Sequence, residues 1–159
     1  MNKLSQKQRV QVIAALVEGN SIRSIVRMTG VSKNTVTKLL ADIGEACAAY
    51  QDKAFQNLPC KRIQADEIWS FCYSKDKNVP EQFKGEFGYG DVYTWTAICA
   101  DTKLVPCWLL GRRDTHAAVE FISDLASRLP NRVQLILTGI VRTWKPLKIL
   151  LAVRSTMRC

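Results

Sequence analysis

The sequence has very little of what a metal centre requires. It contains a single histidine, His116, and its six cysteines never form a CxxC pair. Because a tetrahedral zinc site needs clustered ligands, this scatter argues against structural zinc. We therefore expect reduced thiols that mostly fill the core, and a histidine that lies on the surface near the start of a helix.

Long apolar stretches are missing as well. No run reaches the length of about 18 residues that marks a membrane helix, and the N-terminus has no apolar signal core. The sequence therefore predicts a cytoplasmic protein without a membrane partner. Its 159 residues suffice for one domain with a substantial core, or for a small module and a larger one.

Acidic residues are absent after Asp124. The whole chain has 23 Lys and Arg against 14 Asp and Glu, a formal net charge of +9, which favours a polyanionic partner. Five of the basic residues follow Leu137, and without them 18 basic residues face the same 14 acidic ones, or +4. Much of the basic excess therefore belongs to the C-terminal tail.

Residues 1–46 are patterned as three short helices. Ser5 and Gln8 form a capping box ahead of apolar residues at helical spacing. Ser32 caps the third helix, and Gly30 supplies the residue tolerant of positive φ that a tight turn between two helices needs. This pattern predicts an all-α helix-turn-helix domain.

The start of the third helix carries polar side chains of the types that contact phosphates and base edges. They are Lys33, Asn34, Thr35, Thr37 and Lys38. We interpret them as DNA-binding residues; the alternative is a generic three-helix bundle with a solvated polar face.

Residues 47–60 read as a linker, and strands follow from Lys61 onward. Three predicted strands precede a helix capped by Asp114 or Thr115, and a fourth strand begins at Arg132. The three strands cover residues 61–73, 92–100 and 104–110. Strand, strand, strand, helix, strand is the opening of a ribonuclease H-like fold. The predicted class is thus mixed α/β (α+β), with an incomplete ribonuclease H-like sheet and helix over residues 61–137.

Two adjacent carboxylates, Asp66 and Glu67, lie in the middle of the first strand. Because successive strand residues point to opposite faces, these two side chains point apart. Apolar residues on both faces indicate an inner strand, where a buried carboxylate is costly without a partner or metal. Either Asp66 has such a partner, or it reaches water or pairs with Lys61 or Arg62.

The runs DEIW, GDVYTWTAICADT, GRRDTHAAVEFISDL and RVQL, from Asp66 to Leu135, resemble bacterial insertion-sequence transposases of the insertion-sequence-one (InsA–InsB) family. The resemblance implies a DDE enzyme, in which three carboxylates hold two Mg²⁺ ions for DNA cleavage and strand transfer. Asp66 corresponds to the first carboxylate and thus to a metal ligand. The implied partners are the double-stranded ends of the insertion element, with a homo-oligomer or full-length transposase, in the bacterial cytoplasm at the nucleoid.

The second and third carboxylates of that family are missing here. Residues 137–159, back-translated with allowed codons and read one base earlier, give TDGHRAYLEAVEDTFGSEVDYAM, which contains the expected second motif. We therefore interpret 138–159 as an out-of-frame tail and the chain as a truncated transposase, catalytically inactive and with weak or no Mg²⁺ binding. Such a shift of reading frame has three alternative origins: a decayed gene, a sequencing error or programmed frameshifting.

Two other functions fit the same sequence. One is a helix-turn-helix repressor of transposition without enzymatic activity. The other is a metal-dependent nuclease of ribonuclease H type that uses Asp66, Glu67 and Asp101.

Overall fold

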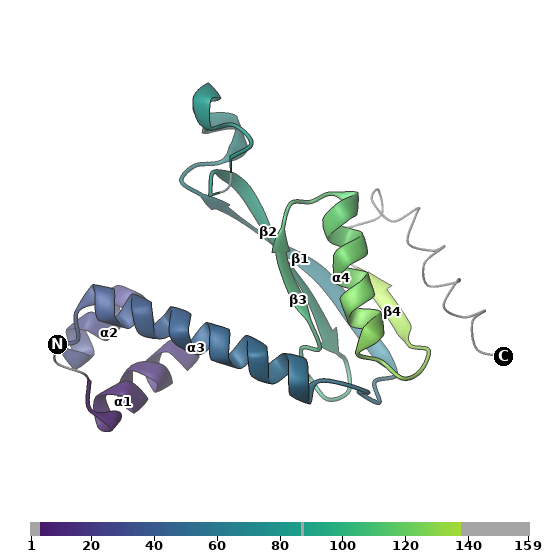
Figure 1. The fold of residues 1–159 in the computed structure, drawn as a ribbon, viewed down its shortest axis with the longest axis horizontal. Coiled ribbons are helices and arrows are strands. Elements are labelled where there is room, and N and C mark those ends of the chain that lie inside the picture. Colours follow the sequence, from purple (N-terminus) through teal and green to yellow (C-terminus); the bar gives the residue numbers. More distant parts are fainter. Residues whose placement is uncertain (1–3, 87, 138–159) are drawn as a thin grey trace. The chain divides into compact units, whose positions relative to one another are not determined.

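The protein is a mixed α/β chain of two compact units, Met1–Ala54 and Phe55–Cys159 (Figure 1). The computed structural model describes residues 4–86 and 88–137. The predicted out-of-frame tail, residues 138–159, lies outside the described residues. Each unit is described by itself below.

The first unit contains α1 (Gln6–Val17), α2 (Ile22–Thr29) and α3 (Lys33–Ala54). Ser5 and Gln8 form the expected capping box at the start of α1. Gly30 ends α2 in the left-handed conformation, with φ +68°, as the turn requires. The small core consists of Val12, Ile25, Val31 and Val36.

Helix α3 extends beyond the predicted end of the N-terminal domain. Residues 47–54 of the expected linker are helical, because α3 continues to Ala54. The stretch from residue 45 to residue 54 has no glycine or proline and consists largely of good helix formers, so it propagates the helix without an apolar stripe.

The second unit is built on a four-stranded sheet in the order β3-β2-β1-β4. Its strands are β1 (Arg62–Cys72), β2 (Gly90–Cys99), β3 (Trp108–Gly111) and β4 (Gln134–Leu137). Strand β1 is antiparallel to β2 and parallel to β4, and β3 is antiparallel to β2. Strand β1 is therefore an inner strand as predicted, and in the described part of the chain, which ends at residue 137, β4 pairs with Arg62–Ala65.

The third strand is shorter than predicted. Instead of covering 104–110 it begins at Trp108, and Pro106 precedes it. Proline cannot donate a ladder hydrogen bond. Backbone contacts between this stretch and β2 run from the Ala97 N–H to the Cys107 carbonyl and from the Cys99 N–H to the Leu104 carbonyl.

Helix α4 (Thr115–Ser127) packs on one face of the sheet, with Asp114 as its N-cap: the Ala117 N–H donates to Asp114 Oδ1 over 2.9 Å. Trp95 from β2 meets Phe121 from α4, with ring centroids 5.9 Å apart. His116 is exposed in the first turn of α4, as expected. Three of the five described cysteines are buried in this core: Cys60, Cys99 and Cys107.

The loop between β1 and β2 joins two antiparallel neighbours of the sheet. It closes through paired contacts: the Asp91 N–H donates to Asp76 Oδ1 at 2.7 Å, and the Asp76 N–H donates to Asp91 Oδ1 at 3.2 Å. A Cβ at Gly90 would lie 1.9 Å from Asp76 Oδ1, and Gly90 has φ +93°, so this position requires glycine.

Candidate functional site

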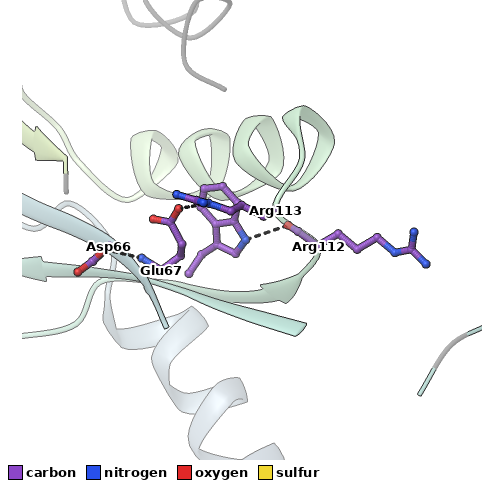
Figure 2. A network of polar contacts seen from close by, with 5 residues as sticks. Asp66, Glu67, Arg112 and Arg113 are labelled. Atoms are coloured by element: carbon purple, nitrogen blue, oxygen red, sulfur yellow. Dashed lines mark hydrogen bonds and ion pairs between the residues drawn. The ribbon is translucent and has the colours of Figure 1, made fainter. Parts of the chain in front are cut away.

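The two adjacent carboxylates of β1 lie on opposite faces of the sheet, as the strand period demands (Figure 2). Glu67 points to the helix-covered face, the one that packs on α4, and its side chain is only 4% exposed. Asp66 lies on the other face and is exposed. The sequence predicts that Asp66 is the carboxylate in need of a partner, but the buried carboxylate is Glu67.

Glu67 is held by an arginine from the loop between β3 and α4. Arg113 Nε donates to Glu67 Oε1 over 2.7 Å, and the guanidinium carbon of Arg113 lies 5.9 Å from the ring centroid of Tyr93. Trp95 Nε1 donates to the carbonyl of Arg112 over 3.2 Å, which fixes the loop that carries Arg113 (Figure 2). Glu67 Oε2 is buried and has no hydrogen-bond partner among the described residues.

Sequence reasoning missed Arg113 as the partner of Glu67. The two residues are 46 positions apart, and no local motif joins them. A usable signal does exist: a carboxylate on the inner face of a strand needs a cation, and the pair Arg112-Arg113 directly follows the third strand.

The second face of the sheet carries Asp66 among mostly apolar and neutral polar side chains, and no described helix packs on it. We call it the open face; its strand residues are Arg62, Gln64, Asp66, Ile68, Ser70, Cys72, Gly90, Val92, Thr94, Thr96, Ile98, Trp108, Leu110, Gln134 and Ile136. Several large apolar members are well exposed, among them Ile68 at 61% and Leu110 at 54%. Asp66 is the only carboxylate among the strand residues of this face.

Asp66 is engaged mainly by its own strand. Its Oδ1 accepts the backbone N–H of Glu67 over 2.9 Å, and its carbonyl accepts Thr96 Oγ1–H over 3.4 Å. The alternative of an ion pair with Arg62 is wrong, because Arg62 pairs with Asp101 instead. The guanidinium of Arg62 holds the pKa of the Asp101 carboxyl below its usual range. Among the alternatives for Asp66, contact with water is the one that its exposure matches.

The three carboxylates of the nuclease alternative do not come together. Glu67 points to the opposite face from Asp66. Asp101 lies level with Arg62, since the Ala100 N–H donates to the Arg62 carbonyl. Four residues of strand, about 13 Å, separate Arg62 from Asp66.

The described residues do not fit a two-metal centre. Within residues 4–86 and 88–137, no three His, Cys, Asp or Glu side chains gather in a group that could hold a metal ion. Two bridging ions need several convergent carboxylates, and Asp66 alone cannot hold both. No catalytic step through Mg²⁺ is therefore derived for this chain.

The predicted DNA-contacting residues lie along the first turns of α3, and all five are exposed. Thr35 Oγ1 lies 2.8 Å from Ser32 Oγ, and Thr37 Oγ1 donates to the Lys33 carbonyl over 3.0 Å. Lys38 forms an exposed ion pair with Asp42 at 3.1 Å. Lys33 and Asn34 are thus the cation and the amide nearest the helix start.

Comparison with protein-family models gives no match, and comparison with curated proteins gives none either. Within the described ranges, no helix is both long enough and apolar enough to cross a membrane.

Proposed function

We propose that this chain is a DNA-binding, catalytically inactive member of the insertion-sequence-one transposases, related to DDE enzymes. The observation that carries the proposal is the contrast between its two units. The N-terminal unit has an exposed set of DNA-contacting residue types, whereas the described strand residues of the open face include one carboxylate where the DDE reaction needs three.

The helix-turn-helix half of the proposal is supported by the geometry of α2 and α3. The turn between them contains the left-handed Gly30, and α3 starts at Lys33 with its polar residues exposed. A second helix whose first turns carry basic and amide side chains is the element that such proteins insert into the major groove.

The ribonuclease H-like half is supported by the order of the elements. An antiparallel β1–β2–β3 run is followed by α4 and then by β4, which returns parallel to β1. Asp66 sits in the middle of β1, where the family resemblance expects its first carboxylate.

Inactivity follows from what surrounds Asp66. Its neighbour Glu67 is turned to the other face and neutralised by Arg113. Asp101 is engaged with Arg62 at the far end of the strand. One exposed carboxylate binds a single divalent ion weakly at best, so we expect no cleavage and no strand transfer.

DNA binding is tested by titrating the full chain into fluorescent duplex DNA at several salt concentrations. Affinity should fall as salt rises, because counterions are released from phosphates. Lys33→Ala and Asn34→Ala should each weaken binding by about 1–3 kcal/mol if the residue reads a base edge. Lys53→Ala, an exposed lysine at the other end of the same helix, is the control. No measurable binding at low salt, or equal loss with Lys53→Ala, contradicts the proposal.

A second candidate function is repression of transposition by occupancy of the element's ends. The same contrast favours it, since a chain that binds DNA without cutting it competes with an active transposase. Adding this chain to a strand-transfer reaction of an active relative should lower the yield, and Lys33→Ala should restore it. An unchanged yield at saturating chain removes this candidate.

A further inference from the structure

Two buried cysteines meet beside the point where β1 begins and β2 ends. Cys60 lies two residues before β1, and Cys99 is the last residue of β2. Ile63 of β1 is the register partner of Cys99, which brings the start of one strand beside the end of the other. Both cysteines belong to the core between the sheet and α4, and their thiols are hydrogen-bonded to each other. They are free thiols in the structure.

Backbone hydrogen bonds hold both cysteines in place. The Cys60 N–H donates to the Leu58 carbonyl over 2.8 Å, and the Cys60 carbonyl accepts from Asn131 Nδ2 over 3.0 Å. The Cys99 carbonyl accepts the Lys103 N–H over 2.9 Å, which closes the turn that follows β2. The two sulfurs are therefore kept in contact by the fold, and their pairing needs no rearrangement of the sheet.

The turn that follows β2 directs hydrogen-bond donors at the sulfur of Cys99. The hydroxyl and the backbone N–H of Thr102 and the backbone N–H of Asp101 donate to it. Thr102 Oγ1 accepts the Leu104 N–H over 3.3 Å, which leaves its own proton for the sulfur. Burial alone would raise the pKa of Cys99, but these donors and the Cys60 thiol outweigh burial and lower the pKa to about 7. A large fraction of Cys99 is therefore thiolate at neutral pH.

The other member of the pair keeps its proton. Burial raises the pKa of Cys60 to about 11, and its hydrogen bond to Cys99 and the negative charges of Cys99 and Asp101 add to this effect. The Cys99 thiolate in turn attracts the guanidinium of Arg62. A thiolate beside a protonated thiol is the arrangement of a reactive dithiol, in which the thiolate is the nucleophile and the thiol resolves the product.

The pair lies close to solvent although both side chains are buried. Residues 101–103, the turn after Cys99, are all exposed. A depression open to solvent lies beside the pair and is lined by both chain neighbours of Cys60 and by the Arg62–Asp101 ion pair: Pro59, Lys61, Arg62 and Asp101. Local opening of an exposed turn costs much less than unfolding of the core, so a small reagent has a short path to the sulfurs.

We propose that Cys60 and Cys99 are a redox-active pair, which a hydroperoxide such as hydrogen peroxide converts into an intramolecular disulfide. The bond fastens the segment that precedes β1 to the end of β2 and makes residues 60–99 a closed loop. Under reducing conditions both residues remain thiols, in agreement with the expectation from the sequence. The proposal rests on the contact between the two sulfurs and does not depend on DNA binding.

The chemistry proceeds in two steps. The Cys99 thiolate attacks one oxygen of the peroxide, an S–O bond forms, the O–O bond breaks and hydroxide leaves, which gives a sulfenic acid on Cys99. The Cys60 sulfur then attacks the Cys99 sulfur. The S–O bond breaks, the Cys60 proton goes to the departing hydroxyl, and water leaves as the S–S bond forms. The two sulfurs together lose two electrons, which the peroxide takes up as it becomes one water and one hydroxide.

The first test maps the bond in the full, unaltered chain. The chain is treated with hydrogen peroxide at neutral pH, the remaining thiols are alkylated, and tryptic peptides are measured by mass spectrometry without reduction. Cleavage after Lys and Arg releases Cys60 in residues 54–61 and Cys99 in residues 85–103, and neither peptide contains another cysteine. We expect these two peptides joined with the loss of two hydrogens, at least tenfold in excess of any other cross-linked pair. Dithiothreitol should separate them again.

The second test separates the roles of the two cysteines. In Cys60→Ser the sulfenic acid on Cys99 has no thiol to resolve it, so dimedone labelling of Cys99 should rise at least tenfold over the unaltered chain. In Cys99→Ser the nucleophile is gone, and oxidation of Cys60 should slow at least tenfold. Cys107→Ser is the matched control: this thiol is buried in the same core, burial raises its pKa to about 12, and its loss should leave the yield of the bond unchanged.

Three outcomes overturn the proposal. One is a chain in which peroxide oxidises the exposed Cys47 and Cys72 while the peptides 54–61 and 85–103 stay separate and unmodified. The second is dimedone labelling of Cys99 in Cys60→Ser at the level of the unaltered chain. The third is a cross-link of Cys60 or Cys99 to other cysteines in equal yield, which would place the oxidation in the unfolded chain. Because the mapping uses the unaltered chain, it decides the question even where a variant fails to fold.

Discussion

The two faces of the sheet are made by the same strands and have opposite environments. On the helix-covered face, Ile63, Trp95 and Ala97 are fully buried against α4. On the open face, Ile68 and Leu110 are more than half exposed although they are equally apolar. This difference shows that the alternation of side chains along a strand assigns each residue to a face. Whether a helix packs on that face decides how much the residue contributes to stability.

The adjacent carboxylates of β1 show the difference between the two faces most clearly. Glu67 serves stability, because it is desolvated and must keep Arg113. Asp66, one residue earlier, is exposed and free to meet a ligand or a second chain. Substitutions on one face and then on the other should separate these roles.

The largest effect should come from emptying the core beneath α4. Phe121→Ala removes a buried ring that contacts Trp95, and should lower the free energy of unfolding by about 3–5 kcal/mol. Leu110→Ala on the open face should change it by no more than about 0.5 kcal/mol. Urea unfolding followed by tryptophan fluorescence measures both. Equal losses would mean that the open face is packed as well.

Removing the arginine of the buried ion pair should have the next largest effect. Arg113→Ala leaves the Glu67 carboxylate buried without a cation, which should cost about 1–3 kcal/mol of unfolding free energy. This range is below that of a fully buried pair because the Arg113 side chain is 44% exposed. Adding Glu67→Gln to Arg113→Ala should recover part of the loss. If the double variant is no more stable than the single one, the charge on Glu67 is not what Arg113 compensates.

A thiol in the helix-side core should make stability depend on alkaline pH. Burial raises the pKa of Cys107 to about 12, and the Asp124 carboxylate adds to this effect. Above about pH 9 the thiol loses its proton in the unfolded state but keeps it in the folded state. Ionisation therefore lowers the free energy of the unfolded state relative to that of the folded state. Stability should therefore fall by about 1.4 kcal/mol per pH unit between pH 9 and 12 from this group. Cys107→Ala should flatten that slope, and an unchanged slope would assign it to other groups.

Much of the fold follows from local patterns in the sequence. The capping box at Ser5, the left-handed turn at Gly30 and the cap at Asp114 each satisfy backbone groups within a few residues, and the structure confirms them. The inner position of β1 was also predicted from its apolar residues.

The environment of the site could not be predicted in the same way. Which face of β1 is covered depends on where α4 packs, and the Glu67–Arg113 pair joins residues 46 positions apart. The apolar run predicts a third strand from residue 104, but Pro106 cannot donate to the ladder and the strand begins at Trp108. Local patterns therefore fix elements and caps, whereas burial and charge pairing need the tertiary arrangement.

The smallest effect should come from Asp66 itself. Asp66→Asn removes the charge but keeps a carbonyl oxygen that can accept the Glu67 N–H, so the free energy of unfolding should change by no more than about 0.5 kcal/mol. DNA affinity should stay unchanged as well, because the exposed residues of α3 belong to the other compact unit. A loss of unfolding free energy above about 2 kcal/mol for Asp66→Asn would mean that this carboxylate is buried and paired like Glu67. The difference between the open face and the helix-covered face would then not hold at Asp66.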